Sequence, residues 1–471
     1  MSSRTLETSL LYPDISDIIA NPDDIYNPIF KFETKLHTEE KDLDNTDGLL
    51  LNDIYIVRNY VENISDYIEI KLSISMGTFL YDVYDYLNNI EVTLITTKQL
   101  YKDKQPFSIK ERYKAIYLLE KNQGLPNTIS QSKDDLNNNM PVVITLQLLD
   151  RSAETIRIKT THGNFDKGIN SNSDMSIAGF LKSVISEQTN KILIENKQSI
   201  DSFNIEDPDN KDKLKAITIP SFTRIIELPE YIQNNNIGIY NGGVGTYIQK
   251  FGSDPFTYKK SFYIYSLYNN KKFDDAEYKI IFYSPLTSSH STSENTYKYK
   301  DKILKILPHN IPKINDNKET AVMSEGSGFR VSNENSFMKK PVEMNPTKGP
   351  IFKKDSLSSE VIFKDRKDGL NFAPNKQISG NQFKLTTEIL KKNGNYVTIE
   401  ISNIDHDFIY PGAKCKILHE NKEGSITELY GVIHLALITY SNNKPNMMNN
   451  YNITNVQLTS HISLQVFINS D

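Results

Sequence analysis

Three consecutive residues offer the clearest metal-binding chemistry in the chain. Asp405, His406 and Asp407 supply two carboxylates and an imidazole, which are ordinary ligands for metal ions. Adjacent residues of an extended segment point to opposite faces, so we do not expect these side chains to converge on one ion. The segment also leads into the Pro411-Gly412 turn, where Asp and His are common. We therefore predict no metal site.

A glycine cluster resembles a phosphate-binding loop only superficially. Gly242, Gly243 and Gly245 lie within the glycine-dense segment 237–249. They match neither the G-x-G-x-x-G pattern nor a P-loop, because the required glycine spacing and the Gly-Lys-Ser/Thr ending are absent from the sequence. A hairpin or a close backbone crossing at Asn241-Gly242 is the favoured interpretation.

The single cysteine gives no support to an enzyme. Cys415 cannot form an intrachain disulfide or a thiolate zinc cluster. It shares the strand parity of Ile417, which indicates a buried structural thiol. Scattered Asp and Glu residues could form the carboxylate pair of a muramidase, but the sequence singles out no pair. We therefore predict no enzyme, no catalytic residue and no cofactor.

The size and the charge of the chain exclude further classes of protein. The 471 residues suggest about three domains. The 54 Lys and Arg against 59 Asp and Glu give a net charge of −5, which argues against non-specific wrapping of nucleic acid. No apolar run approaches the roughly 20 residues of a membrane span. The N-terminus has no apolar signal region, so we expect synthesis in a reducing cytoplasm. The 27 Tyr residues suit subunit interfaces.

The elements expected to position these residues are mainly strands, with some helix. Alternating apolar residues in Tyr67–Ile74 predict a strand with one buried and one wet face. Residues 112–120 fit either a short helix or a strand. Apolar residues at helical spacing predict one helix, capped by Asp174 and carrying Ile177, Phe180, Leu181, Val184 and Ile185. Further strands are predicted at 90–97, 142–149, around Ile156 and Ile158, and at 262–268, 278–283, 396–402, 414–419, 429–440 and 456–468.

These elements group into a mainly β, α+β chain with a barrel-like module near each end. Residues 337–370 have a local basic bias, which we interpret as a solvated connector. The predicted organisation is an extended N-terminal arm (1–47), a first β-barrel domain (48–165), a mixed α/β middle domain of which a part can return to the first barrel (166–336), a connector (337–375) and a second antiparallel β-barrel domain (376–471).

The order of several motifs resembles the central baseplate hub proteins of contractile-tailed bacteriophages. In the segment Ile68–Thr97, a strand, the aromatic piece Met76–Tyr84 and a second strand are similar to the start of the hub's tail-tube-like first barrel. The other matching stretches are Ile219–Gln249, the Tyr-rich strand Phe262–Phe273, the glycine turn Glu325–Phe329 and Asp407–Tyr440, which is similar to the second barrel. No single motif is diagnostic, and their order carries the resemblance.

The resemblance implies a structural virion protein of the tail baseplate. It implies a homotrimer whose two tube-like barrels per subunit form a pseudo-sixfold ring. Such a ring would join the trimeric spike below to the hexameric tail tube above, with tape-measure and wedge proteins as further partners. DNA would pass through the lumen without specific binding. The alternatives are a tail-associated peptidoglycan hydrolase and a host glycan- or receptor-binding tail protein.

Overall fold

The computed structural model describes most of the chain outside the N-terminal arm and the connector. Its residues are 28–100, 104–122, 141–166, 175–195, 200–211, 213–214, 216–234, 238–252, 254–268, 273–284, 296–308, 313–315, 330–332, 343–344, 360–363, 394–420, 426–441 and 456–469. Outside them lie several predicted features: residues 1–27 of the arm, the Asp174 cap, the glycine turn 325–329, and most of the connector 337–375 with its basic bias.

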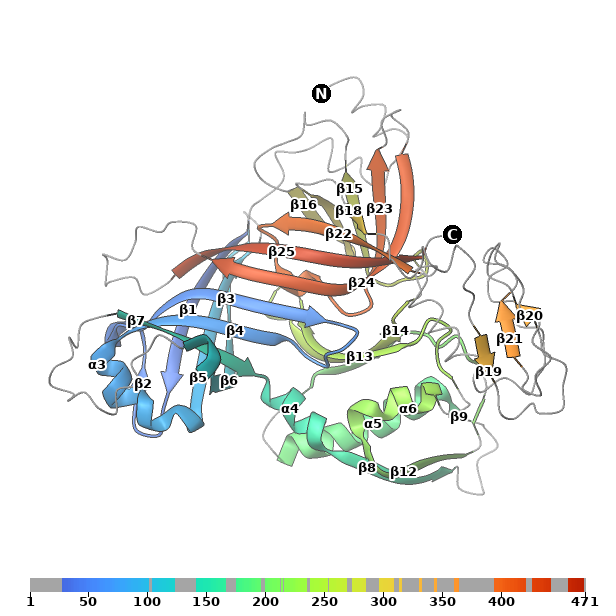
Figure 1. The fold of residues 1–471 in the computed structure, drawn as a ribbon, viewed down its shortest axis with the longest axis horizontal. Helices are drawn as coiled ribbons and strands as arrows, with labels where there is room; N and C mark the ends of the chain where they lie inside the picture. Colours follow the sequence, from blue (N-terminus) through green and yellow to red (C-terminus); the bar gives the residue numbers. More distant parts are fainter. Residues whose placement is uncertain are drawn as a thin grey trace.

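Eight strands close into an antiparallel barrel. Around the ring they run β24–β3–β4–β7–β6–β5–β1–β25, and pairing of β25 with β24 completes the circle. In Figure 1 the blue barrel strands lie beside the red strands β24 and β25. The strands are β1 (Ile29–His37), β3 (Leu50–Asn59), β4 (Tyr67–Ser75), β5 (Ile90–Gln99), β6 (Phe107–Tyr117), β7 (Pro141–Leu149), β24 (Ile426–Ser441) and β25 (Val456–Asn469).

Side chains fill the barrel. The inward positions alternate along each strand, as the apolar pattern predicts. A barrel of eight strands is just wide enough for side chains to occupy its interior. The interior residues, each at most 1% exposed, include Ile54, Ile70, Leu72, Ile90, Val92, Ile144, Leu146, Ala436 and Ile438.

The outer face of β4 is only partly exposed to solvent. The strand prediction for Tyr67–Ile74 is confirmed, but Glu69 is only 6% exposed and Ser73 only 9% exposed. The ammonium group of Lys121 donates to both carboxylate oxygens of Glu69, at 2.5 and 2.6 Å. The Asn52 amide donates to the Ser73 hydroxyl at 2.7 Å. The predicted polar face is therefore partly covered by polar partners.

The barrel takes strands from three of the predicted domains. β1 lies inside the segment 1–47 that was expected to be an arm, and it pairs along its length with β5. β24 and β25 come from the segment 376–471, which was expected to form a separate second barrel. The domain boundaries stay a prediction, but the hydrogen bonding of the first barrel crosses two of them.

β24 and β25 continue out of the barrel into a second sheet. Its order is β16–β17–β15–β23–β24–β25–β22–β18. A bulge between Ile433 and Leu435 marks where β24 changes partner from β3 to β23. The strands that this sheet takes from the segment 376–471 pair with one another antiparallel, as predicted. The sheet is mixed because β15, which comes from the middle segment, pairs in parallel with both β17 and β23. Its remaining strands are β15 (Lys279–Ser284), β16 (Thr296–Lys300), β17 (Ile303–Leu307), β18 (Lys313–Asn315), β22 (Gly394–Ser402) and β23 (Lys414–Glu420).

Helices and short strands form a separate layer beside the barrel. The helix α5 (Ile177–Glu195) is confirmed, and its five predicted apolar residues are all buried in one cluster. The strand predicted around Ile156 and Ile158 is wrong, because this segment is the helix α4 (Arg151–Ile158). The Asp150 side chain caps α4 by accepting from two backbone N–H groups, which satisfies its first turn. Residues 112–120, left open between helix and strand, begin inside strand β6.

A β-hairpin and a ribbon complete this layer. β14 pairs with β13 and, in parallel, with β10, while β8 and β12 form a two-stranded ribbon. No helix in the described ranges is long and apolar enough to cross a membrane. The remaining elements are β2 (Asp42–Leu43), α3 (Met76–Thr78), the π-helical turn Phe79–Val83, β8 (Thr160–Asp166), β9 (Met175–Ser176), β10 (Ser202–Ile205), β11 (Lys213–Leu214), β12 (Ala216–Arg224), α6 (Leu228–Asn234), β13 (Val244–Phe251), β14 (Lys259–Ser266), β19 (Arg330–Ser332), β20 (Glu343–Met344), β21 (Glu360–Phe363), and the 3-10 turns Asn45–Asp47, Tyr84–Asn89, Leu119–Asn122, Ile225–Glu227 and His406–Phe408.

Candidate functional site

A cavity lined by charged side chains lies at one end of the barrel. Its volume is about 60 Å³, room for a few water molecules at roughly 10–15 Å³ each. The ends of β3 and β5 and the starts of β1, β4 and β6 form its wall, and the β13–β14 hairpin and the turn His406–Phe408 cover it. The ionisable residues other than tyrosine that line it are Arg58, Asp66, Lys98, Glu111, Asp150, Lys250, Lys260, His406 and Asp407.

Lys98 holds the covering turn to the barrel wall. Its ammonium group contacts the Asp405 carboxylate at 2.9 and 3.1 Å and also donates to Asp407. The side chains of Lys98, Asp405 and Asp407 are 2%, 0% and 3% exposed. Burial alone would lower the pKa of Lys98, but the two carboxylates raise it, so the lysine stays charged. Two segments separated by 307 positions in sequence are thus joined by buried charges.

Arg58 anchors the same turn from β3. Its guanidinium donates to the Asp66 carboxylate at 3.0 Å and to Asp407 at 3.3 Å. It also donates to the backbone carbonyl of His406 and, at 2.9 Å, to that of Ile409. Burial would raise the pKa of Asp407, but three neighbours hold it below its usual range: His406, which is protonated only at the low pH where this carboxyl titrates, and the cations Lys98 and Arg58. Asp407 is therefore a carboxylate shared between two cations.

His406 is neutral in this setting. Burial lowers its pKa to about 3, with the nearby cations adding to the effect and Asp407 opposing it. The neutral ring lies 2.5 Å from the Tyr440 hydroxyl through Nδ1. Its Nε2 atom lies 3.4 Å from Asp407. The imidazole therefore connects the covering turn to strand β24 without carrying charge.

The remaining charges of the cavity are also paired. Lys250 contacts Glu111, and Lys260 contacts Asp150. Burial and the Lys260 charge lower the pKa of Lys250 to about 7, whereas the adjoining Glu111 carboxylate favours the charged form. A small cavity whose carboxylates all have cationic partners can stabilise a fold, but it leaves no acid–base pair open to a substrate.

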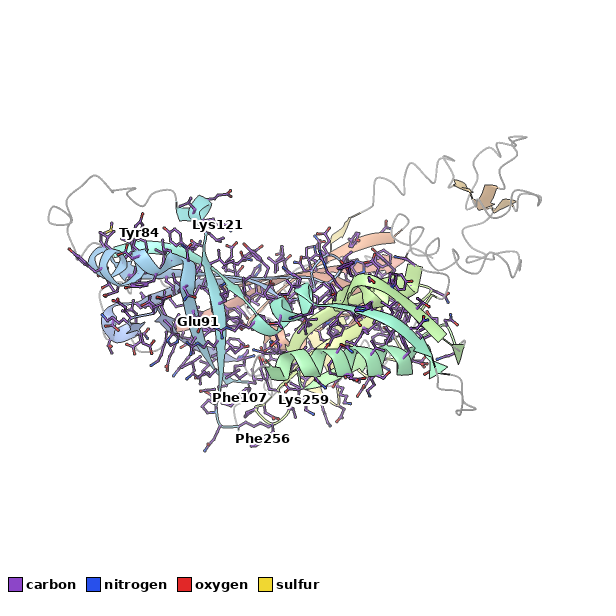
Figure 2. The ribbon with its side chains drawn as sticks, turned by 90° about the horizontal axis from the view of Figure 1, so that it is seen from below. Tyr84, Glu91, Phe107, Lys121, Phe256 and Lys259 are labelled. Carbon is purple, nitrogen blue, oxygen red and sulfur yellow. The ribbon has the colours of Figure 1, made fainter. Side chains whose placement is uncertain are left out.

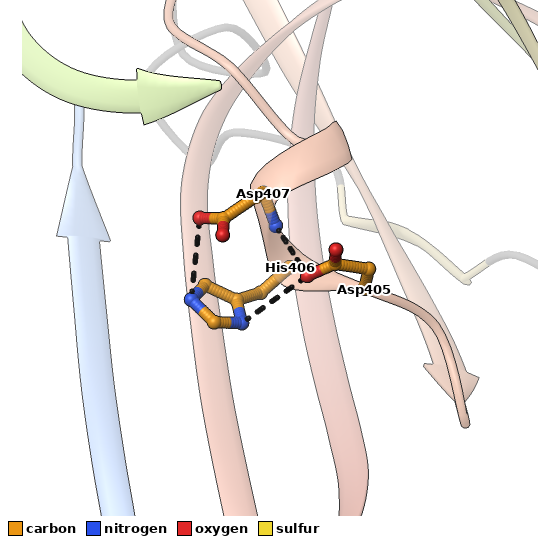
Figure 3. Close-up of side chains that lie close together, drawn as sticks. All are labelled: Asp405, His406 and Asp407. Carbon is orange, nitrogen blue, oxygen red and sulfur yellow. Dashed lines mark hydrogen bonds and ion pairs between the residues drawn. The ribbon is translucent and has the colours of Figure 1, made fainter. Parts of the chain in front are cut away.

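The three residues weighed as metal ligands do converge. One oxygen or nitrogen from each of Asp405, His406 and Asp407 lies within 4.8 Å of the others, as Figure 3 shows. The argument that they point apart is wrong, because they occupy a 3-10 turn and not a strand. The space between the carboxylates is taken by the ammonium group of Lys98. A metal ion here would have to displace that lysine.

The glycine cluster is a close packing point. Gly242 and Gly243 accept backbone hydrogen bonds from Tyr268 and Leu267, at 2.8 and 3.1 Å. A Cβ atom on Gly245 would lie 2.6 Å from the Tyr265 ring. The interpretation as a close backbone crossing is confirmed, since the two hydrogen bonds join the main chains of the two segments, and the Tyr265 ring leaves no room for a side chain at Gly245.

Cys415 is buried, as predicted. Its side chain is 0% exposed, and burial raises the pKa of the thiol above its ordinary value. A buried thiol with a raised pKa holds its proton at neutral pH and is a weak nucleophile.

Sequence reasoning missed Arg58 and Lys98. Both side chains point into the barrel. Arg58 lies on the same face of β3 as Ile54 and Ile56, and Lys98 lies on the same face of β5 as Leu94. A charged residue in an apolar register is a signal that a buried partner exists. That signal could have pointed to a network, although it could not have named the acids on the other side.

The fold has remote similarity to tail proteins in solved structures. It is similar to the 43 kDa tail protein of prophage MuSo2 from Shewanella oneidensis, with 10% identity and a TM-score of 0.42 over 92% of this chain and 98% of that chain. It is similar to the tail protein from Neisseria meningitidis MC58, with 10% identity and a TM-score of 0.43 over 92% of this chain and 96% of that chain. It is also similar to the half-lidded Francisella PdpA-VgrG complex, with 12% identity and a TM-score of 0.38 over 99% of this chain and 63% of that chain.

No protein-family model matches the sequence, and no curated protein matches it. These three solved structures are two tail proteins, one of them from a prophage, and a PdpA-VgrG complex. At these identities and scores the likeness concerns the course of the chain and assigns no activity.

Proposed function

We propose that the chain is a structural subunit of a phage tail baseplate, the central hub that joins a trimeric spike to a hexameric tail tube. It acts as a homotrimer, and each copy contributes two β-modules to a pseudo-sixfold ring. The motif order described above supports this role. The continuous strands β24 and β25 also support it, because they make the barrel and the second sheet one stiff unit.

The observation that carries the proposal is the filled interior of the barrel. Its inward side chains are almost completely buried, and the charged cavity at its end has room only for a few waters. DNA therefore cannot pass through a single chain. A conduit requires several copies arranged around an axis, with the outer faces of their sheets lining the hole. The net charge of −5 suits a lumen through which DNA slides without sticking.

The proposal includes the absence of catalysis. The carboxylates that lie closest to an acid–base arrangement, Asp405 and Asp407, are bound by Lys98 and Arg58. A cavity of about 60 Å³ is also far smaller than the roughly 300–1,000 Å³ of ordinary ligand sites. The partners are the spike protein on one side and tube subunits on the other, with tape-measure and wedge proteins nearby.

A co-assembly experiment tests the role. The chain is expressed together with spike and tube proteins of the same tail, and the complexes are imaged by electron microscopy. We expect rings with a central hole that carry a spike on one face and start a tube on the other. A chain that joins neither protein would overturn the proposal. Clearing of peptidoglycan in a gel, abolished by one Asp or Glu substitution, would replace it with the hydrolase alternative.

A further inference from the structure

One stretch of the outer barrel wall is exposed to solvent and positively charged. The outward residues of β6 are all exposed, and Lys110, Arg112 and Lys114 stand at alternate positions, about 6.8 Å apart. We call the basic wall the set Ser108, Lys110, Arg112, Lys114 and Ile116. Apolar Ile116 is 41% exposed at its end. Three cations on one face stand out in a chain of net negative charge.

The basic wall keeps an excess of positive charge after its own ion pairs are counted. Its neighbouring acid Glu91 is contacted by Arg112 at 2.5 Å and also by Arg151 of α4. Within the part of the chain that the structure describes, Lys110 and Lys114 have no ion-pair partner. Figure 2 shows Glu91 on the barrel between Phe107, where β6 begins, and Tyr84.

The opposite charge gathers at the Tyr84 end of the same barrel. Residues 38–47 and 76–89 contain seven carboxylates and one lysine, a net charge of −6. Lys41 contacts Asp82 at 3.1 Å, which joins the two segments. We call these residues the acidic knob: Glu39, Glu40, Asp42, Asp44, Asp47, Tyr81, Asp82, Tyr84 and Asp85.

The acidic knob also presents aromatic rings. Tyr81 is 50% exposed and Tyr84 is 42% exposed, although both belong to ordered helical turns. Exposed tyrosines among acids complement a surface of Lys and Arg, because the rings attract cations through their faces and the carboxylates pair with them. Tyr and Arg are also the residue types that dominate binding energy at protein interfaces.

We propose that the acidic knob of one copy of this chain docks on the basic wall of the next copy. The two surfaces differ from each other, so the contact is head-to-tail, and such contacts close into a ring when the rotation between copies allows it. The occupant of the basic wall is a second copy because the complementary charge and the aromatic anchors lie on the same chain. This inference rests on the proposed function, since it supplies the contact that a hub ring needs.

Charge reversal tests the contact. The wall variant is Lys110→Glu with Lys114→Glu, and the knob variant is Glu40→Lys with Asp85→Lys, all at exposed positions. Each variant alone should weaken self-association by at least about a hundredfold, because like charges then face each other. The matched control, Lys182→Glu with Lys300→Glu, reverses two exposed lysines elsewhere and should associate like the wild type. Sedimentation velocity measures all of them.

Two combinations show whether the contact is head-to-tail. A chain carrying both the wall and the knob changes should regain assembly, because attraction is restored with the signs exchanged. A mixture of the wall variant with the knob variant should co-assemble although neither variant associates alone, because each knob then meets a wall of opposite charge only on the other variant. Circular dichroism confirms folding. If a variant does not fold, a salt titration of the wild type replaces it, and association should weaken as the screening length falls from about 10 Å to 3 Å.

The outcomes separate this inference from the proposed function. A wild-type oligomer that all the charge reversals leave intact, and that high salt does not weaken, overturns the knob-and-wall contact while the hub proposal stands. Binding of the wall variant to tube and spike proteins with normal stoichiometry also overturns the contact and leaves the hub proposal in place. A wild-type chain that stays monomeric in every salt, alone and with its partners, overturns both.

Discussion

Replacing Lys98 with methionine should weaken the attachment of the turn His406–Phe408 to the end of the barrel. The change keeps the length of the side chain and removes its charge. Asp407 retains Arg58, whose guanidinium lies 3.3 Å away. Asp405 loses its cationic partner, and its side chain is 0% exposed. The Lys98→Met protein therefore contains one uncompensated buried carboxylate.

The size of the effect follows from that burial. Removing one partner of a buried ion pair is expected to lower the free energy of unfolding by about 3–5 kcal/mol. A double variant that also carries Asp405→Asn should recover a large part of the loss, because the amide removes the stranded charge. The amide oxygen can still accept the hydrogen bond from the Asp407 N–H, which the carboxylate accepts at 3.1 Å.

The loss should also depend on pH with a definite sign. Burial already raises the pKa of Asp405 against the opposing charge of Lys98. The loss of Lys98 raises it further, so the folded variant takes up a proton at a higher pH than the wild type does. The deficit relative to the wild type should therefore shrink between neutral pH and about pH 4–5. Urea denaturation followed by tyrosine fluorescence and circular dichroism measures it, since the chain has 27 Tyr and no Trp.

The result that would refute the reasoning is simple to recognise. A loss below about 1 kcal/mol would place Lys98 in the class of weak surface pairs. An equal loss in the single and the double variant would show that the Asp405 charge is not what destabilises the protein.

Three further predictions concern stability. Burial lowers the pKa of His406 to about 3 and that of His434 to about 4. The free energy of unfolding should therefore be at its full value above about pH 6.5 and fall as the pH drops toward 4, because the unfolded chain binds protons that the folded chain does not. Urea midpoints measured against pH check this. Gly245→Ala should lower the free energy of unfolding by about 1–3 kcal/mol by forcing a Cβ against the Tyr265 ring; an unchanged urea midpoint would contradict it. Phe222 is 86% exposed with a φ of +68°, so Phe222→Gly should stabilise the fold by about 1 kcal/mol, and a lower melting temperature would speak against the strain.

Periodicity predicts the elements whose apolar faces are regular. The strand at Tyr67–Ile74 and the helix α5 follow from alternation and from helical spacing. The strand prediction around Ile156 and Ile158 is wrong because two apolar residues at strand spacing were given more weight than Asp150, whose side chain caps the start of a helix. The prolines that precede β1 favour an arm, although Phe30, Phe32 and Leu36 share one parity and are buried.

The candidate site could not be predicted from local sequence patterns. Lys98 meets Asp405 across 307 positions, and no local pattern in the sequence specifies such a pair. Strand alternation does not apply to Asp405–Asp407, because contacts from Arg58 to the carbonyls of His406 and Ile409 help fold the segment into a turn. The closure of the barrel by β24 and β25 is a third case, since the strands that complete it come last in the sequence.

The mass of the purified chain in native mass spectrometry tests the central claim most directly. The hub account predicts a trimer, three times 54.0 kDa or about 162 kDa, that survives dilution to micromolar concentration. Obligate interfaces of this kind bury more than about 2,000 Å² and should hold at that concentration. A mass of 54.0 kDa at every concentration, with no larger species when spike and tube proteins are added, would contradict it.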